Sequence, residues 1–209
     1  AKLKTKYVCM ECGYESPKWL GKCPECNQWN TLVEEVDTKT ASSSAPSISS
    51  LSKPERIQDI SMEEEMRQST GLGELDRVLG GGIVKGSLIL VGGDPGIGKS
   101  TLLLQLSDNL GKRGLKVLYI SGEESVKQIK IRAGRMGADS ENIYLQSENN
   151  MEYIQKTVLD TNPDVLIIDS IQTVYNPAIM SAPGSVSQVR DATGNLMRIA
   201  KGDGIAVFI

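Results

Sequence analysis

The feature that most restricts the fold is a glycine-rich segment, GDPGIGKS, at residues 93–100. It follows the apolar run SLILVG at 87–92 and precedes LLLQL, so it lies between an expected strand and an expected helix. Glycines let successive backbone N–H groups point into one concavity, where a lysine adds a cation and a hydroxyl can ligate Mg²⁺. The segment therefore predicts a phosphate-binding loop. The alternative is a glycine-rich strand-to-helix turn with an incidental lysine. The segment fits G-x-x-x-x-G-K-[ST] at every required position and lies where the mechanism requires, which favours the phosphate-binding loop.

This loop predicts a nucleotide site. Lys99 would reach the β- and γ-phosphates, Ser100 would ligate Mg²⁺, and the positive end of the following helix dipole would face the phosphates. The residues expected to bind ATP or ADP are Gly93, Asp94, Pro95, Gly96, Ile97, Gly98, Lys99, Ser100 and Thr101.

Apolar runs alternate with amphipathic stretches after Pro54. Near-continuous apolar strands separated by helices indicate a parallel sheet covered on both faces, so the expected fold class is α/β, doubly wound. The expected strands are 87–92, 117–121, 143–145, 165–169 and 205–209, and the expected helices are 100–113, 125–136, 151–161 and 186–201.

Two acidic residues at strand ends are candidates for catalysis. Asp169 closes the run VLIID, where a carboxylate can orient a water in the Mg²⁺ shell; its alternative role is to cap a helix. Glu123 follows VLYIS, a strand that we expect beside the one preceding the phosphate loop, and could orient the attacking water. Alternatively, Glu123 and Glu124 only stabilise the N-terminal turn of the next helix. We expect Glu123, Lys99 and Asp169 to be catalytic.

The chain contains no histidine. Ser-His-Asp hydrolysis, Cys-His proteolysis and His-ligated metal sites are therefore excluded. Its four cysteines have the spacing Cys9-x2-Cys12, ten residues, Cys23-x2-Cys26, which can place four thiolates on one tetrahedral Zn²⁺ of structural role. A pair of disulfides and an iron site of rubredoxin type are the alternatives.

Aromatic and basic side chains accompany the cysteines. They could stack on single-stranded bases and meet phosphates, but aromatics in a very small metal domain more often cover the metal core, which is the interpretation that we prefer. Docking of a protein is a further alternative. These residues are Tyr7, Tyr14, Trp19, Trp29, Lys18 and Lys22.

Composition divides the chain into a four-cysteine module at 1–33, a Ser- and Thr-rich flexible linker at 34–56 and a third part at 57–209. The third part contains the phosphate loop and is the expected ATPase core. No apolar run reaches the roughly 20 residues that a membrane span needs, and the first ten residues lack the apolar region of a secretory signal, so we expect a cytoplasmic protein without a membrane partner. The last residues, GIAVFI, form an expected strand. We therefore expect the chain to be the front part of a longer protein.

Longer segments carry a family resemblance. TGLGELDRVLGGGIVKGSLILVGGDPGIGKSTLLLQ at 70–105 resembles the opening of a RecA-family ATPase core. Together with the cysteine module and with YISGEES at 119–125, LIIDSIQT at 166–173 and GSVSQVRD at 184–191, it is similar to the RadA (Sms) family of bacterial DNA repair proteins.

The resemblance implies a DNA-dependent ATPase that promotes branch migration and heteroduplex extension in homologous recombination. Such a helicase-like motor would act on single-stranded or branched DNA, with the RecA recombinase as a partner, and would form a homo-hexameric ring. Gln188 and Arg190 fall where ring ATPases place a DNA-facing loop and helix; the alternative is an exposed helix face. The basic run Lys127, Lys130, Arg132 and Arg135 is expected to be a solvated helix surface.

In that family, the core continues into a Lys-Asn-Arg-Phe-Gly motif and a Lon-protease-like domain, and this chain contains neither. We therefore expect hydrolysis and ring formation to need segments beyond Ile209. Two other readings remain: an ATP-gated DNA- or protein-binding adaptor that does not translocate, and a small-molecule kinase, which would leave the cysteine module unexplained.

Overall fold

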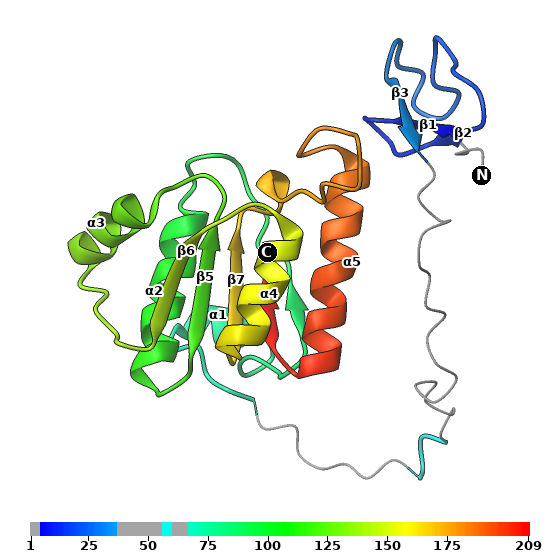
Figure 1. The fold of residues 1–209 in the computed structure, drawn as a ribbon. Helices are drawn as coiled ribbons and strands as arrows, with labels where there is room; N and C mark the ends of the chain where they lie inside the picture. The colour runs from blue at the N-terminus through cyan, green and yellow to red at the C-terminus, as the bar shows by residue number, and fades with distance from the viewer. Residues whose placement is uncertain (1–4, 37–55, 60–66) are drawn as a thin grey trace.

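The computed structural model describes residues 5–36, 56–59 and 67–209 (Figure 1). The amino-terminal module is a three-stranded antiparallel sheet in the order β2-β1-β3. Its strands are β1 (Thr5–Cys9), β2 (Glu15–Ser16) and β3 (Leu32–Val36). Because β3 pairs with β1 as far as Val36, the module extends three residues beyond the expected boundary at 33.

A five-stranded parallel sheet forms the second part of the molecule, in the order β4-β8-β7-β5-β6. The strands are β4 (Leu88–Ile89), β5 (Val117–Ser121), β6 (Ile143–Ser147), β7 (Val165–Asp169) and β8 (Ala206–Phe208). All five expected strands are present. The α/β class is confirmed.

Helices cover both faces of this sheet (Figure 1). Helices α2 (Lys99–Lys112) and α3 (Val126–Met136) pack on one face, and α4 (Met151–Thr161) and α5 (Val186–Asp203) pack on the other. A short helix, α1 (Gly73–Val78), precedes β4, and a 3₁₀ turn, η3 (Ile171–Thr173), follows β7. The result is a three-layer α/β/α core.

Successive side chains of a strand point to opposite faces of the sheet, so each strand contributes to a hydrophobic cluster on either face. On β5, Val117 and Tyr119 belong to the cluster under α2 and α3, whereas Leu118 and Ile120 belong to the cluster under α4 and α5. All residues of β5 are buried, so its sequence reads as a continuous apolar run. Strong caps fix where the helices begin: Ser125, for example, makes a reciprocal capping box with Gln128 at the start of α3.

The prediction that β5 lies beside the strand preceding the phosphate loop was wrong. The sheet places β8 and β7 between β4 and β5, so β5 lies beside β7 and β6 instead of beside the strand that precedes the phosphate loop. Pairing of β4 with β8 joins segments more than a hundred residues apart, which local patterns do not encode. The carboxyl ends of the strands still meet at one edge.

The expected linker at 34–56 lies largely outside the described residues. Among the helices that the structure describes, none combines the length and the apolar character needed to cross a bilayer.

Candidate functional site

The phosphate loop joins β4 to α2. Gly96 (φ +78°) and Gly98 (φ +105°) adopt left-handed conformations that other residues rarely take, and α2 begins immediately afterwards at Lys99. The Lys99 ammonium donates to the carbonyl oxygens of Gly93 at 2.7 Å and Asp94 at 2.9 Å. The cation is therefore held over the loop at the amino-terminal end of the helix.

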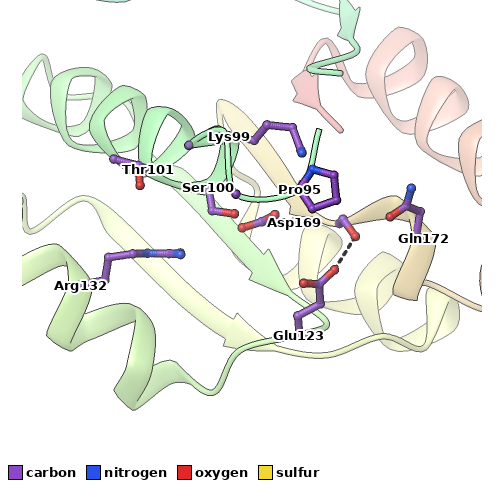
Figure 2. A pocket seen from close by; sticks show the side chains of 11 residues that line it. Pro95, Lys99, Ser100, Thr101, Glu123, Arg132, Asp169 and Gln172 are labelled. Carbon is purple, nitrogen blue, oxygen red and sulfur yellow. Dashed lines mark hydrogen bonds between the residues drawn. The ribbon is translucent and has the colours of Figure 1, made fainter. Parts of the chain in front are cut away.

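A cavity of about 450 Å³ lies at this loop (Figure 2). It brings together Lys99, Glu123 and Asp169, the three residues expected to be catalytic, although they come from different elements. The residues around it are Pro95, Gly96, Gly98, Lys99, Ser100, Thr101, Glu123, Arg132, Asp169, Ser170 and Gln172. Its volume is in the range of small-molecule sites.

Tyr119 orients the Asp169 side chain through a hydrogen bond. The two strands that carry them are neighbours, and the Tyr119 hydroxyl donates to Oδ2 of Asp169 at 2.6 Å. Burial, followed by the hydrogen bond to Asp169, raises the pKa of Tyr119. The phenol therefore keeps its proton and remains a donor at neutral pH.

Glu123 is held by the residue next to Asp169. The Ser170 hydroxyl donates to Oε1 of Glu123 at 2.8 Å (Figure 2). Gly122 permits this approach, because a Cβ there would collide with the side chain of Thr173. Gly122 also donates its N–H to the Asp169 carbonyl at 3.1 Å. The loops after β5 and β7 are thus locked together, with both carboxylates at the cavity.

Arg132 corrects one expectation. Lys127, Lys130 and Arg135 are exposed as expected, but Arg132 lines the cavity, and its side chain is only 24% exposed. Its guanidinium pairs with Glu124, with Nη2 2.9 Å from Oε2. Nε is buried without a hydrogen-bond partner among the described residues. Arg132 lies three residues after buried Ile129, on the inward side of α3, and lines the cavity while it is paired with Glu124.

The donor set fits a magnesium nucleotide. The Ser100 hydroxyl and the Asp169 carboxylate provide hard oxygen ligands of the kind that Mg²⁺ takes. Lys99, Arg132 and the backbone N–H groups at the start of α2 provide positive charge for a polyphosphate.

Gln188 and Arg190 lie apart from this cavity, on α5, and differ in exposure. Gln188 is 1% exposed, and its amide nitrogen donates to the carbonyl oxygens of Asn176, Ile179 and Ser181. Its side chain braces the loop before α5 and offers no exposed atom to DNA. Arg190 is exposed, and its guanidinium lies beside Gly13 of the metal-binding module. Its contact with DNA stays a prediction.

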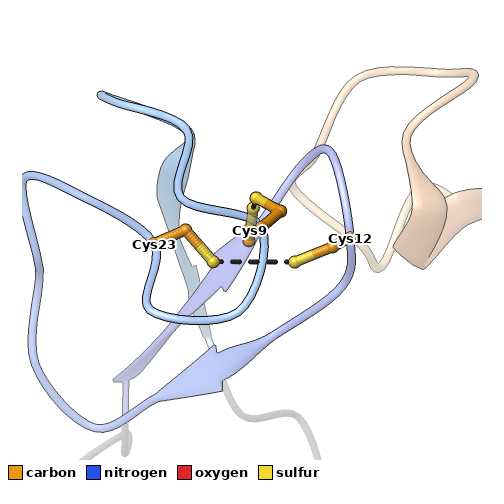
Figure 3. A group of neighbouring side chains, drawn as sticks. Cys9, Cys12 and Cys23 are labelled. Atoms are coloured by element: carbon orange, nitrogen blue, oxygen red, sulfur yellow. Dashed lines mark hydrogen bonds between the residues drawn. The ribbon is translucent and has the colours of Figure 1, made fainter.

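The four cysteines converge in the amino-terminal module, and Figure 3 shows Cys9, Cys12 and Cys23 of this group. Their sulfur atoms all lie within 4.8 Å of one another, and the pairs Cys9–Cys26 and Cys12–Cys23 are 3.6 Å apart. Four sulfurs bound to a tetrahedral zinc at about 2.3 Å would be about 3.8 Å apart. The arrangement fits one metal ion held by four thiolates. All four are free cysteines, so the disulfide alternative is not realised.

Local hydrogen bonds prepare Cys9 for this role. Burial alone would raise the pKa of Cys9, but hydrogen bonding with the Thr31 hydroxyl and with the backbone N–H groups of Cys12 and Glu11 outweighs burial and lowers the pKa to about 6. Cys9 is thus ready to bind as a thiolate.

The aromatic side chains of the module divide into two groups. Tyr7 and Tyr14 pack against the cluster of Cys9, Cys23 and Leu32, as the packing interpretation expects. Trp19 and Trp29 do not, because they are 54% and 69% exposed. For the two tryptophans the packing interpretation is wrong.

Sequence reasoning missed Tyr119, Arg132 and Ser170. Arg132 could have been found, since it lies three residues after buried Ile129 on the inward side of a helix. Tyr119 is the one residue with a polar terminus in the otherwise apolar part of VLYIS, which also is a signal. The contact of Ser170 with Glu123 joins residues 47 apart and has no local signal.

Fold and site together define a P-loop ATPase core that follows a four-cysteine metal-binding ribbon. In agreement, residues 7–34 match the family described as a rubredoxin metal binding domain, and residues 68–153 match the family described as the KaiC ATPase.

The whole chain is similar to DNA repair protein RadA from several bacteria. Identity is 55% over 213 residues with the protein of Bacillus subtilis, 57% over 212 residues with that of Halalkalibacterium halodurans, and 55% over 210 residues with that of Listeria monocytogenes. The match covers 100% of this chain and 46% of each relative, so the chain spans about half the length of these relatives. The chain belongs to the family of DNA repair protein RadA.

Proposed function

We propose that this chain is the ATP- and zinc-binding part of a DNA-dependent ATPase that processes recombination intermediates during DNA repair. The observation that carries the proposal is the convergence of Lys99, Ser100, Glu123 and Asp169 on one cavity at the amino-terminal end of α2. In this proposal the polyphosphate lies in the loop at 93–101, and Ser100 and Asp169 hold Mg²⁺, directly or through water.

A separate carboxylate, that of Glu123, is assigned to the attacking water. Glu123 orients this water, and its hydrogen bond to Ser170 fixes the carboxylate beside Asp169. Tyr119 supports Asp169 from within the sheet. Because Ser170 directly follows Asp169, a shift of the metal ligand would be transmitted to Glu123 and to η3, and from there toward α5 and Arg190.

The finer features of the proposal follow from the family. They are branch migration and heteroduplex extension by a helicase-like motor on single-stranded or branched DNA, the RecA recombinase as a partner, a homo-hexameric ring, and a place in the cytoplasm. Since the chain spans about half of its relatives, ring formation and full turnover belong to the full-length protein.

Two substitutions test the proposal against an ATP-gated adaptor. Lys99→Ala removes the cation at the phosphate loop, whereas Glu123→Gln leaves nucleotide binding intact and removes the group that orients water. A motor loses branch migration with either substitution. If full-length protein with Glu123→Gln still extends heteroduplex at the parent rate, hydrolysis is not required and the motor is excluded.

A further inference from the structure

The exposed tryptophans of the metal-binding module form a defined surface. The six-membered rings of Trp19 and Trp29 both lie beside Gly21, because a Cβ on Gly21 would be 3.5 Å from Cη2 of Trp19 and 3.9 Å from Cζ3 of Trp29. We name Trp19, Gly21, Lys22 and Trp29 the tryptophan platform. Two large rings on one small surface, both more than half exposed, are unusual unless they meet a partner.

The turn that holds Cys23 and Cys26 makes this platform rigid. Lys22 and Trp29 face each other in an antiparallel β-bridge, and Asn30 donates its N–H to the Gly21 carbonyl at 2.8 Å. The turn between them contains Cys23 and Cys26, which lie in the four-cysteine cluster. A bound metal ion therefore fixes the rings in advance, which reduces the entropy lost when a ligand binds.

Positive charge accompanies the rings. The Lys22 ammonium lies 5.8 Å from the centroid of the Trp29 ring, and both Lys18 and Lys22 are exposed. Neither lysine makes an ion pair with a carboxylate of the residues that the structure describes, whereas Lys6, on β1, pairs with Glu15 at 2.7 Å. Cations and aromatic faces are thus presented together to a ligand.

The surroundings favour bases over apolar side chains as the ligand. The residues next to the rings along the chain, Asn27, Gln28 and Asn30, are polar and exposed, so the rings do not line a continuous apolar groove. Successive bases of a single strand stack on such isolated rings while lysines contact the phosphates. We infer that the tryptophan platform binds single-stranded DNA by base stacking. This inference rests on the proposed function, which supplies DNA as the ligand.

The chain itself carries a suitable probe. Trp19 and Trp29 are its two tryptophans, so all tryptophan fluorescence reports on the platform. Titration of the zinc-loaded chain with an oligo(dT) strand is expected to quench this emission saturably. With Trp29→Ala or Trp19→Ala, affinity measured by anisotropy of the labelled strand is expected to fall about tenfold, which corresponds to about 1.4 kcal/mol per stacked base.

Three comparison variants make the test specific. Trp29→Phe keeps a ring for stacking and should recover part of the affinity that Trp29→Ala loses. Tyr153→Ala removes an exposed aromatic side chain of α4, and Lys6→Gln removes the paired lysine of β1; both should leave affinity unchanged. Zinc content of each variant identifies loss of folding, and only variants that keep their zinc are compared.

The outcomes separate the inference from the proposed function. Quenching of the parent together with weaker binding by the alanine variants supports the platform. Tight DNA binding with unchanged tryptophan emission, and with parent affinity in the double variant of Trp19→Ala and Trp29→Ala, overturns the platform and leaves the proposed function standing; the surface would then serve a protein partner. If full-length protein binds no single-stranded DNA, both fail.

Discussion

The hydroxyl of fully buried Tyr119 donates a hydrogen bond of 2.6 Å to Asp169, so the acid at the mouth of the cavity is oriented by a phenol inside the sheet. Oδ2 of Asp169 therefore accepts a hydrogen bond from the interior of the sheet. Asp169 and Ser100 both line the cavity. Tyr119 is a positioning residue for the proposed metal ligand.

Tyr119→Phe tests this relationship because it removes the hydroxyl and keeps the ring. The concentration of Mg²⁺ that supports half-maximal ATP binding is expected to rise at least about tenfold, since a hydrogen bond to a charged group is worth about 1.5–3 kcal/mol and about 1.4 kcal/mol corresponds to tenfold. Tyr144→Phe, at an exposed position of β6, is the matched control. An unchanged Mg²⁺ requirement would reduce Tyr119 to a packing role.

Ser170→Ala removes the donor to Glu123. We expect turnover of the full-length protein to fall about tenfold with little change in ATP affinity, because the carboxylate stays present but loses its orientation. Glu123→Gln should lower turnover by at least about a hundredfold. Glu141→Gln, at an exposed glutamate away from the cavity, should have no effect. Equal turnover of the parent and Ser170→Ala would argue against positioning of Glu123 by Ser170.

Arg132→Ala and Arg135→Ala compare two arginines on one helix. Only Arg132 lines the cavity, so its loss should weaken ATP binding about tenfold, in line with the strength of charge-assisted contacts. Arg135 is exposed, and its substitution should leave the affinity unchanged. Calorimetric titration with a non-hydrolysable nucleotide measures both. Equal affinities of the two variants for the nucleotide would show that Arg132 does not contribute to ATP binding.

The four-cysteine site leads to predictions about zinc content and about zinc release at low pH. One zinc per chain is expected by elemental analysis, and Cys23→Ser should abolish it. Because zinc binds the deprotonated thiolates, protons compete with the metal for the four sulfurs, and release of zinc to a colorimetric chelator should increase as the pH falls. Retention of zinc by Cys23→Ser would contradict a four-thiolate site.

Asp108 links pH to the stability of the core. Burial would raise the pKa of Asp108, but hydrogen bonds from Lys112 and from the N–H groups of Ser140 and Asp139 lower it. Its stabilisation is therefore complete above the unfolded-state value near 4 and is lost as the pH falls through the lower folded-state value. Asp108→Asn should cost about 2 kcal/mol at pH 7, measured by urea unfolding, and less at pH 3. A cost independent of pH would exclude this charge effect.

Local patterns predicted much of this molecule. The run VLIID and the segment GDPGIGKS define a strand and a loop by themselves, because period and glycine placement are local properties. The order of strands was not predictable in this way, since β8 lies between β4 and β7 through pairings distant in sequence. The same reason hid Ser170 as the partner of Glu123. The exposure of Trp19 and Trp29 depends on how a small ribbon folds around its metal, which composition does not specify.

The most direct test of the account is phosphate release by full-length protein with Mg²⁺ and ATP, measured with and without single-stranded DNA. The account predicts that DNA increases the rate, and that Glu123→Gln abolishes the increase while nucleotide still binds. A rate that single-stranded DNA does not change, in protein that binds both ATP and DNA, would contradict the central claim that this site couples ATP hydrolysis to DNA.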